Sequence, residues 1–277
     1  MAHDQRDRKN IHAFRKQQGL TQEELANLVN VSFQAISKWE NGNSTPDIST
    51  LPLLANVFHC DIDALLGYPA EQRRILDYEE RYRAPGYYWG VQPSGMCYEV
   101  LRLCPPVRPL RLLDIACGEG KNAVFFARNG YRVTAFDAVS LALDKARALA
   151  DQAGAQVHFF QANLLDFRLD SQFDILFCSG ALHYIPPHLR REILENYQAH
   201  TAPSGLHALN VFVRKPFVTS PSDEKPGRYR WISGELFTHY ADWLIASCSE
   251  RIFPCNSGGV PHRHCMDTLL AIKQAEV

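Results

Sequence analysis

The sequence lacks a strong net charge and a long apolar run. Its 29 lysines and arginines nearly balance its 30 aspartates and glutamates, so the formal charge is −1 and draws the chain toward neither nucleic acid nor anionic membrane. No stretch reaches the roughly 18 consecutive apolar residues that a membrane-spanning helix needs. The first residues, MAHDQRDRKN, mix both signs of charge and do not resemble a signal peptide. These absences predict a cytoplasmic protein that binds no membrane.

The sequence also lacks paired cysteines. Its eight cysteines form no C-x-x-C motif and stand apart, at positions 60, 97, 104, 117, 178, 248, 255 and 265. In a chain without secretory features, such thiols are expected to be reduced, not joined in disulfides or gathered around zinc. We therefore expect no metal site.

The pattern of residues changes near position 110, which predicts two domains. Residues 9–67 show only short helical periods, broken by loop-forming segments such as NGNSTPD. From about 110, short β-branched or aromatic runs alternate with helical segments, as in a parallel sheet with helices on both faces. We expect an all-α domain at 1–68, a connecting helix at 69–85 and an α/β domain at 86–277. The expected strands contain RLLDIA, YRVTAF, QVHFF, FDILFC and LHALNVFV.

Residues 21–67 contain two consecutive helix starts. Thr21 and Glu24 have the spacing of a capping box, and Ser32 can cap the next helix, which Gly42 would end. This segment, TQEELANLVNVSFQAISKWENGNSTPDISTLPLLANVFHCDIDALLG, resembles the helix-turn-helix domain of the Cro/C1 (XRE) repressors. The resemblance implies binding to double-stranded DNA. The residues that it places at bases or phosphates are Gln22, Ser32, Phe33, Gln34, Ser37 and Lys38.

Charge argues against strong DNA binding by a single copy of this domain. Residues 1–68 carry six lysines and arginines against eight aspartates and glutamates, a net charge of −2. A homodimer on a two-fold DNA site is therefore expected. The alternative interpretation is a helical interaction module that does not bind DNA.

The segment RLLDIACGEGKNAVFFARNGYRVTAFDA, residues 111–138, predicts a strand, a glycine turn, a helix and a second strand that ends in an acid. A dinucleotide-binding turn would be G-x-G-x-x-G, but Asn122 and Ala123 stand where the third glycine would be, which disfavours NAD. The segment resembles motif I of class I S-adenosylmethionine-dependent methyltransferases, with Ala116 where that family usually has glycine. The resemblance implies a Rossmann-like domain with a seven-stranded, mostly parallel sheet and S-adenosylmethionine as cofactor.

That resemblance also implies roles for individual residues. Gly118 and Gly120 would let the backbone approach the methionine part of the cofactor without a Cβ in the way. Asp114 would lie near its ammonium group, and Asp137 would accept hydrogen bonds from both ribose hydroxyls. The other expected cofactor-binding residues are Ala116 in the glycine turn, Asn163 and Leu164 near the adenine, Cys178 and Ser179 at the end of the fourth strand, and Tyr88 and Trp89. The last two could form an aromatic lid or pack between domains.

Outside motif I, segments such as GYYWGVQPSGMCYEVL and HRHCMDTLLAIK resemble the tellurite-resistance (TehB-like) methyltransferases. The resemblance implies an oxyanion of tellurium or selenium as methyl acceptor, which would need cationic donors around its oxygens. The candidates are His262, Arg263, His264 and Arg230. A solvated entrance to the last strand is the alternative interpretation of residues 262–264.

Together these features predict a methyltransferase for a small acceptor, such as an oxyanion or a small thiol, fused to a DNA-binding regulator domain. One alternative is a transcription regulator whose second domain senses S-adenosylmethionine or a small ligand without turnover. Another is a natural-product methyltransferase whose helix-turn-helix controls its own gene cluster.

Overall fold

The computed structural model describes residues 4–58, 60, 62–67, 70–218, 228–256 and 261–275. It divides into two compact units, Met1–Arg74 and Ile75–Val277. The division falls inside helix α6 (Ala70–Arg83), in the segment for which we predicted a connecting helix. Among the described helices, none combines the length and apolar character needed to cross a membrane.

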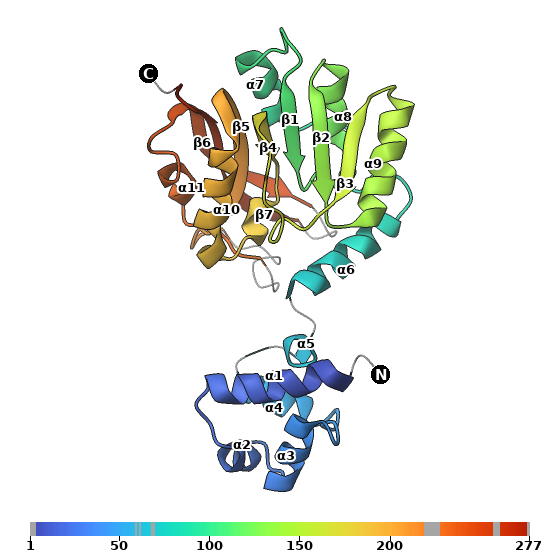
Figure 1. Cartoon of the computed structure of the whole chain (residues 1–277), viewed down its shortest axis with the longest axis vertical. Coiled ribbons are helices and arrows are strands. Elements are labelled where there is room, and N and C mark those ends of the chain that lie inside the picture. The colour runs from blue at the N-terminus through green and yellow to red at the C-terminus, as the bar shows by residue number, and fades with distance from the viewer. Residues whose placement is uncertain are drawn as a thin grey trace. The chain divides into compact units, whose positions relative to one another are not determined.

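The smaller unit is all-α in its described residues, as predicted (Figure 1). Leu25, Ile36, Trp39 and Leu54 form the centre of its core, because helical spacing directs one apolar side of each helix inward. The helices are α1 (Asp4–Gln17), α2 (Gln22–Leu28), α3 (Phe33–Asn41), α4 (Leu51–Val57) and α5 (Ile62–Leu65).

The predicted helix signals around the turn between α2 and α3 are present in the structure. Thr21 and Glu24 form the complete capping box at the start of α2. Ser32 Oγ accepts a hydrogen bond from Ala35 N at 3.2 Å, and Gly42 ends α3 in the left-handed conformation, with φ of 70°. These contacts fix where α2 begins and where α3 begins and ends.

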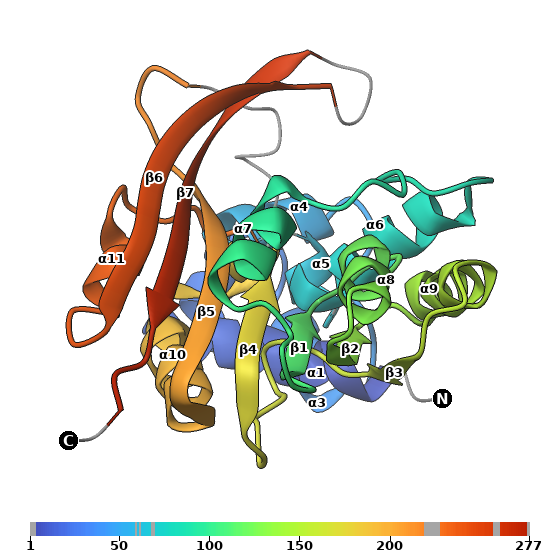
Figure 2. The ribbon, with the colours of Figure 1, turned by 90° about the horizontal axis from the view of Figure 1, so that it is seen from above.

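The larger unit contains the predicted seven-stranded sheet, with strand order β3-β2-β1-β4-β5-β7-β6. β1, β2, β3, β4 and β5 run parallel, and β7 runs antiparallel to both neighbours. Figure 2 shows β6 and β7 as a long curved ribbon at one edge of the sheet. The strands are β1 (Arg111–Ile115), β2 (Arg132–Asp137), β3 (Val157–Gln161), β4 (Phe173–Cys178), β5 (Thr201–Val213), β6 (Leu244–Cys255) and β7 (His262–Ile272).

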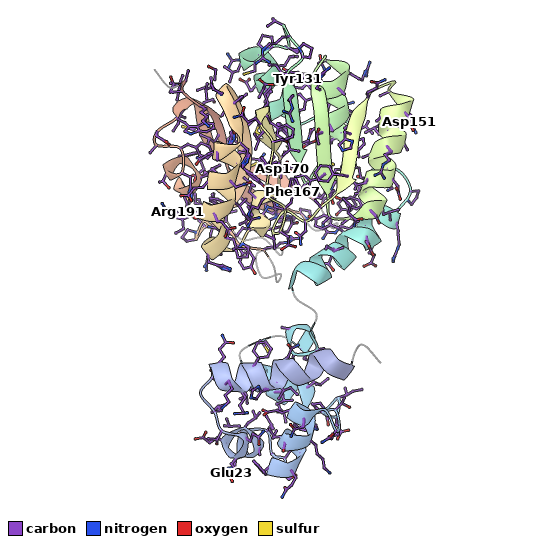
Figure 3. All side chains as sticks on the ribbon, viewed as in Figure 1. Glu23, Tyr131, Asp151, Phe167, Asp170 and Arg191 are labelled. Atoms are coloured by element: carbon purple, nitrogen blue, oxygen red, sulfur yellow. The ribbon has the colours of Figure 1, made fainter. Side chains whose placement is uncertain are left out.

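Helices cover both faces of this sheet (Figures 1 and 2). Side chains alternate along each strand, so Leu112 and Leu113 enter different hydrophobic clusters. One face holds α7 (Gly95–Leu103), α8 (Lys121–Arg128) and α9 (Ser140–Gln152), and the other holds α10 (Pro187–Ala199) and α11 (Glu235–Thr238). Side chains fill the layers between helices and sheet, while Asp151 and Arg191 lie at the outer sides of α9 and α10 (Figure 3). This arrangement leaves the carboxyl ends of β1, β2 and β4 beside one another, where ligands of open α/β sheets bind.

Candidate active site

A tight turn between β1 and α8 forms the centre of the site. Ala116, Gly118 and Gly120 all have positive φ, at 53°, 55° and 83°. A Cβ added to Gly118 would lie 3.2 Å from Tyr82 Oη and 4.0 Å from Trp89 Cδ1, so Gly118 faces the side of the turn that these rings cover. Ala116 adopts a conformation that favours glycine, consistent with the glycine usual at this place in motif I.

Gly120 has a packing role that the sequence did not predict. A Cβ there would lie 2.7 Å from the Ala146 Cβ of α9, far closer than two carbon atoms can approach. The space beside Gly120 is therefore occupied by a packed helix. The absence of a Cβ at Gly120 thus allows α8 and α9 to pack closely. That both glycines let the backbone approach the cofactor stays a prediction.

Two buried carboxylates lie beneath the turn. Asp137, at the end of β2, accepts hydrogen bonds from Gly118 N at 2.8 Å and from Val139 N at 3.0 Å. Asp114, in β1, is 1% exposed, and its Oδ2 has no hydrogen-bond partner among the described residues. Burial, followed by the charge of Asp137, raises the pKa of Asp114 to about 8. Asp114 is thus a buried acid with an acceptor atom left to be satisfied.

The neighbouring strand ends supply the other expected cofactor-binding residues. Leu164 is buried, and Asn163 Oδ1 accepts a hydrogen bond from Leu165 N at 3.1 Å. After β4, Ser179 and Gly180 are held by Asn210 of β5, whose Oδ1 accepts from Gly180 N at 2.7 Å. Cys178 is fully buried, and burial raises its pKa.

An aromatic cover lies over the glycine turn. The backbone N–H groups of Tyr88 and Trp89 each donate to the buried Glu119 carboxylate at 3.1 Å, and Lys145 Nζ lies 3.2 Å from the same carboxylate. Trp89 Nε1 donates to Tyr82 Oη at 3.3 Å. These contacts tie the predicted lid residues to the turn within the larger unit.

Sequence reasoning missed Tyr82, Glu119 and Asn210. Two signals could have found the first two. Tyr78 and Tyr82 are four residues apart in a polar helix, so their rings lie on the same side of it and are expected to pack against another part of the protein. Glu119 lies inside the glycine turn itself. Nothing in the local sequence marks Asn210, which contacts residues 30 positions away.

The structure separates the four candidate acceptor-binding residues. Side chains alternate along β7, so His262 and His264 share one face while the exposed Arg263 lies on the other. The centre of the Phe212 ring lies 4.8 Å from the ring centre of His264 and 4.8 Å from that of His183. The guanidinium carbon of Arg230 lies 4.9 Å from the centre of the Phe212 ring. His264 and Arg230 therefore gather around Phe212, and Arg263 does not.

The predicted DNA-binding residues also differ in their environments. Ser32, Phe33, Gln34 and Lys38 are exposed at the start and along the outer side of α3. Ser37 is half-buried, and its Oγ accepts a hydrogen bond from Asn41 Nδ2.

Gln22 is engaged inside the helix-turn-helix. Its Nε2 donates to Glu40 Oε2 at 2.7 Å, and the same carboxylate forms a buried ion pair with Arg15. Because Gln22 Nε2 already donates to Glu40, it is less available to donate a hydrogen bond to a DNA phosphate.

Comparison with known proteins agrees with this fold. Residues 11–65 match the helix-turn-helix family model, and residues 112–205 match the model described as a methyltransferase domain. Hemagglutinin 1 of Eikenella corrodens is 28% identical over 149 residues, which are 53% of this chain and 48% of that protein. The ubiquinone biosynthesis O-methyltransferase of Rickettsia felis is 27% identical over 108 residues, 39% of this chain and 43% of that enzyme.

Among solved structures, TehB from Haemophilus influenzae superposes with a TM-score of 0.58 at 17% identity, over 71% of this chain and 66% of that one. The chain spans less than half the length of the two curated relatives. The match to TehB is a likeness of fold. The chain therefore joins an amino-terminal region that matches the helix-turn-helix family model to a region that matches the methyltransferase domain model and has the class I methyltransferase fold.

Proposed function

We propose that the larger unit binds S-adenosylmethionine and transfers its methyl group to a small acceptor. The observation that carries this proposal is the turn at Gly118, closed by the Asp137 carboxylate beneath it, at the carboxyl edge of the sheet. A glycine with positive φ and a buried acid with an unsatisfied oxygen both fit a ligand that carries an amino-acid part and a ribose.

Each residue near the turn has a task in this proposal. Asp137 would accept hydrogen bonds from the ribose hydroxyls, since the two oxygens of a carboxylate can accept about four hydrogen bonds in all. Asp114 would face the ammonium group, and Leu164 would contact the adenine. Tyr82 and Trp89 would exclude water from the reacting atoms.

When bound, the cofactor supplies an electrophilic methyl group on a sulfonium. The protein then chiefly has to position a nucleophile about 3 to 3.5 Å from that carbon. We place the acceptor beside Phe212, because Arg230 and His264 approach this ring at the carboxyl edge of the sheet. A cation there favours an anionic or electron-rich acceptor.

The experiment that tests this function is formation of S-adenosylhomocysteine from S-adenosylmethionine with tellurite, selenite and a panel of small thiols. We expect turnover with at least one of these acceptors. If no acceptor is methylated above the uncatalysed rate while S-adenosylmethionine changes the affinity of the chain for DNA, the sensor alternative replaces the enzyme.

Asp114 gives a prediction that does not depend on turnover. Its pKa of about 8 keeps most of this carboxyl protonated at pH 7, and a cationic ammonium beside it would lower that pKa. Binding of S-adenosylmethionine at pH 7 should therefore release a proton. Titration calorimetry in buffers of different ionisation enthalpy measures this release, which should disappear in Asp114→Asn. Equal binding heats in all buffers for the parent protein would contradict the placement of Asp114.

We propose that the smaller unit binds double-stranded DNA as a dimer through the exposed side of α3. Lys38 is the single cation in that helix, so one copy offers little positive charge to DNA phosphates. A dimer presents two copies of the helix to the same DNA. Half-sites about one helical turn apart, roughly 34 to 36 Å, are expected for this geometry.

Two substitutions in α3 separate base recognition from phosphate binding. Gln34→Ala should weaken DNA binding by about 1 to 3 kcal/mol and relax the sequence preference. Lys38→Ala should weaken binding to all sequences, and the slope of log affinity against log salt concentration should become smaller by about 1. Arg191→Ala, which removes an exposed cation from α10, is the matched control. Failure of the parent to retard fragments from upstream of its own gene at low salt would favour the interaction-module interpretation.

A further inference from the structure

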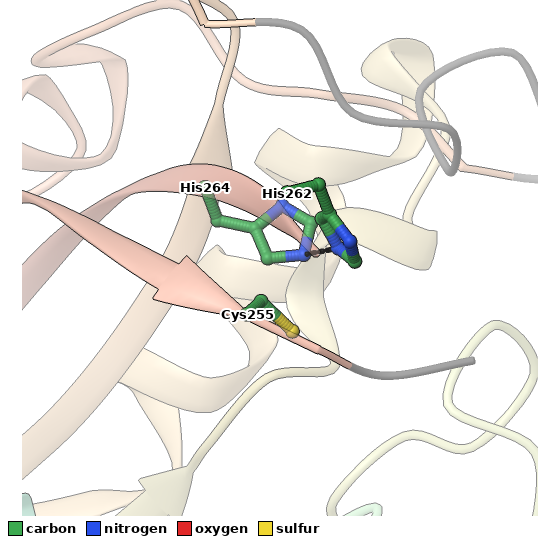
Figure 4. Close-up of side chains that lie close together, drawn as sticks. All are labelled: Cys255, His262 and His264. Carbon is green, nitrogen blue, oxygen red and sulfur yellow. Dashed lines mark hydrogen bonds between the residues drawn. The ribbon is translucent and has the colours of Figure 1, made fainter. Parts of the chain in front are cut away.

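We propose that Cys255, His262 and His264 form a binding site for a zinc ion. One ligand atom of each side chain lies within 4.8 Å of the other two. Figure 4 shows the three side chains converging at the end of the β6/β7 ribbon. One thiolate and two imidazoles are the donors that zinc, a borderline-soft ion, prefers in proteins.

The register of the two strands brings these residues together. Cys255 of β6 is directly opposite His262 of β7, and Phe253 is opposite His264. Because side chains alternate along a strand, residues 253 and 255 share a face with residues 262 and 264. The spacing Cys-x6-His-x-His thus becomes a compact cluster only in this antiparallel register.

The distances suit tetrahedral coordination. His262 Nε2 and His264 Nε2 are 3.0 Å apart, and two Zn–N bonds of about 2.0 to 2.1 Å would separate them by about 3.3 Å. With a Zn–S bond of about 2.3 Å, the sulfur would lie about 3.6 Å from each nitrogen. In the structure the three ligand atoms all lie within 4.8 Å of one another, so an ion would draw the sulfur closer to the two nitrogens.

One side of the proposed site packs against aromatic side chains, and the other side is accessible to solvent. His264 is buried, and its ring lies against Phe212 and Phe253 at 4.8 and 5.8 Å. Cys255 and His262 are half-buried, which gives an ion access from solvent. Three protein ligands leave the fourth tetrahedral position to water or a small external donor.

This proposal differs from the expectation that the chain has no metal site. That expectation rested on the absence of C-x-x-C pairs, whereas these ligands come from two strands. It does not depend on methyl transfer, because the site would bind zinc whether or not the chain binds S-adenosylmethionine.

Metal analysis of the full chain tests the proposal. After treatment with a chelator and reloading with zinc, the parent protein should retain about one tightly bound ion per chain. Cys255→Ser and His262→Gln should each weaken zinc binding by about tenfold or more. Cys248→Ser, which changes an exposed cysteine of the same strand, should bind zinc as the parent does.

Cobalt substitution gives a second readout. The parent loaded with cobalt should show a thiolate-to-cobalt charge-transfer band together with the strong visible bands of tetrahedral cobalt, and Cys255→Ser should lose the charge-transfer band. Circular dichroism checks that each variant is folded. Zinc retention that is equal in parent and Cys255→Ser, or a parent without the charge-transfer band, would overturn the proposal.

Discussion

Replacing Gly118 by valine is expected to abolish binding of S-adenosylmethionine while the helical content stays unchanged. A Cβ at this position would point at Tyr82 Oη, 3.2 Å away, and would fill the space beside the turn. The φ of 55° adds strain for any residue with a side chain. Titration calorimetry of the parent and the variant measures the loss.

Gly154 provides the control for backbone strain. Its φ is 62°, close to that of Gly118, but a Cβ there meets no atom within 4 Å. Gly154→Val should therefore lower stability without changing cofactor affinity. If Gly118→Val binds as tightly as the parent, motif I does not hold the cofactor in this chain.

Replacing Arg230 by alanine is expected to reduce turnover about a hundredfold, the equivalent of about 3 kcal/mol for one lost charge-assisted contact with the acceptor. The guanidinium lies against Phe212, among the side chains proposed to line the acceptor position. Because Arg230 would touch the acceptor and not the cofactor, affinity for S-adenosylmethionine should barely change. Steady-state kinetics with the best acceptor from the panel, together with calorimetry, separates the two effects.

Arg263 is the matched control for this substitution. It is exposed on the opposite face of β7 from His262 and His264, although the sequence placed all three together as candidates. Arg263→Ala should leave turnover near the parental value. A large loss with Arg263→Ala and none with Arg230→Ala would mean that the acceptor lies elsewhere.

Much of the fold could be predicted because local patterns determine it. RLLDI and FDILFC are short apolar runs that suit strands buried on both faces, and they form β1 and β4. Capping residues such as Thr21 and Ser32 mark helix starts, because each accepts a hydrogen bond from the residue three positions further along the chain. Motif I is equally local, because Asp114, Gly118 and Asp137 lie within one strand-turn-helix-strand unit.

Features that depend on distant contacts could not be predicted. The role of Gly120 is decided by Ala146 of α9, and the cover over Gly118 depends on Tyr82, which precedes it by 36 positions. The grouping of His262 with Cys255 depends on the register of an edge strand, β6, whose side chains are mostly exposed. Because few side chains of this strand are buried, its sequence shows little alternation of apolar and polar residues from which the register could be predicted.

A crystal of the full chain soaked with S-adenosylhomocysteine tests the central claim, cofactor binding at the glycine turn, most directly. We predict electron density against Gly118, with the ribose hydroxyls at hydrogen-bonding distance from the Asp137 carboxylate and the sulfur directed toward the side of the sheet where Phe212 lies. A well-diffracting crystal without the ligand at saturating concentration, or with the ligand bound away from Gly118 and Asp137, would contradict the account.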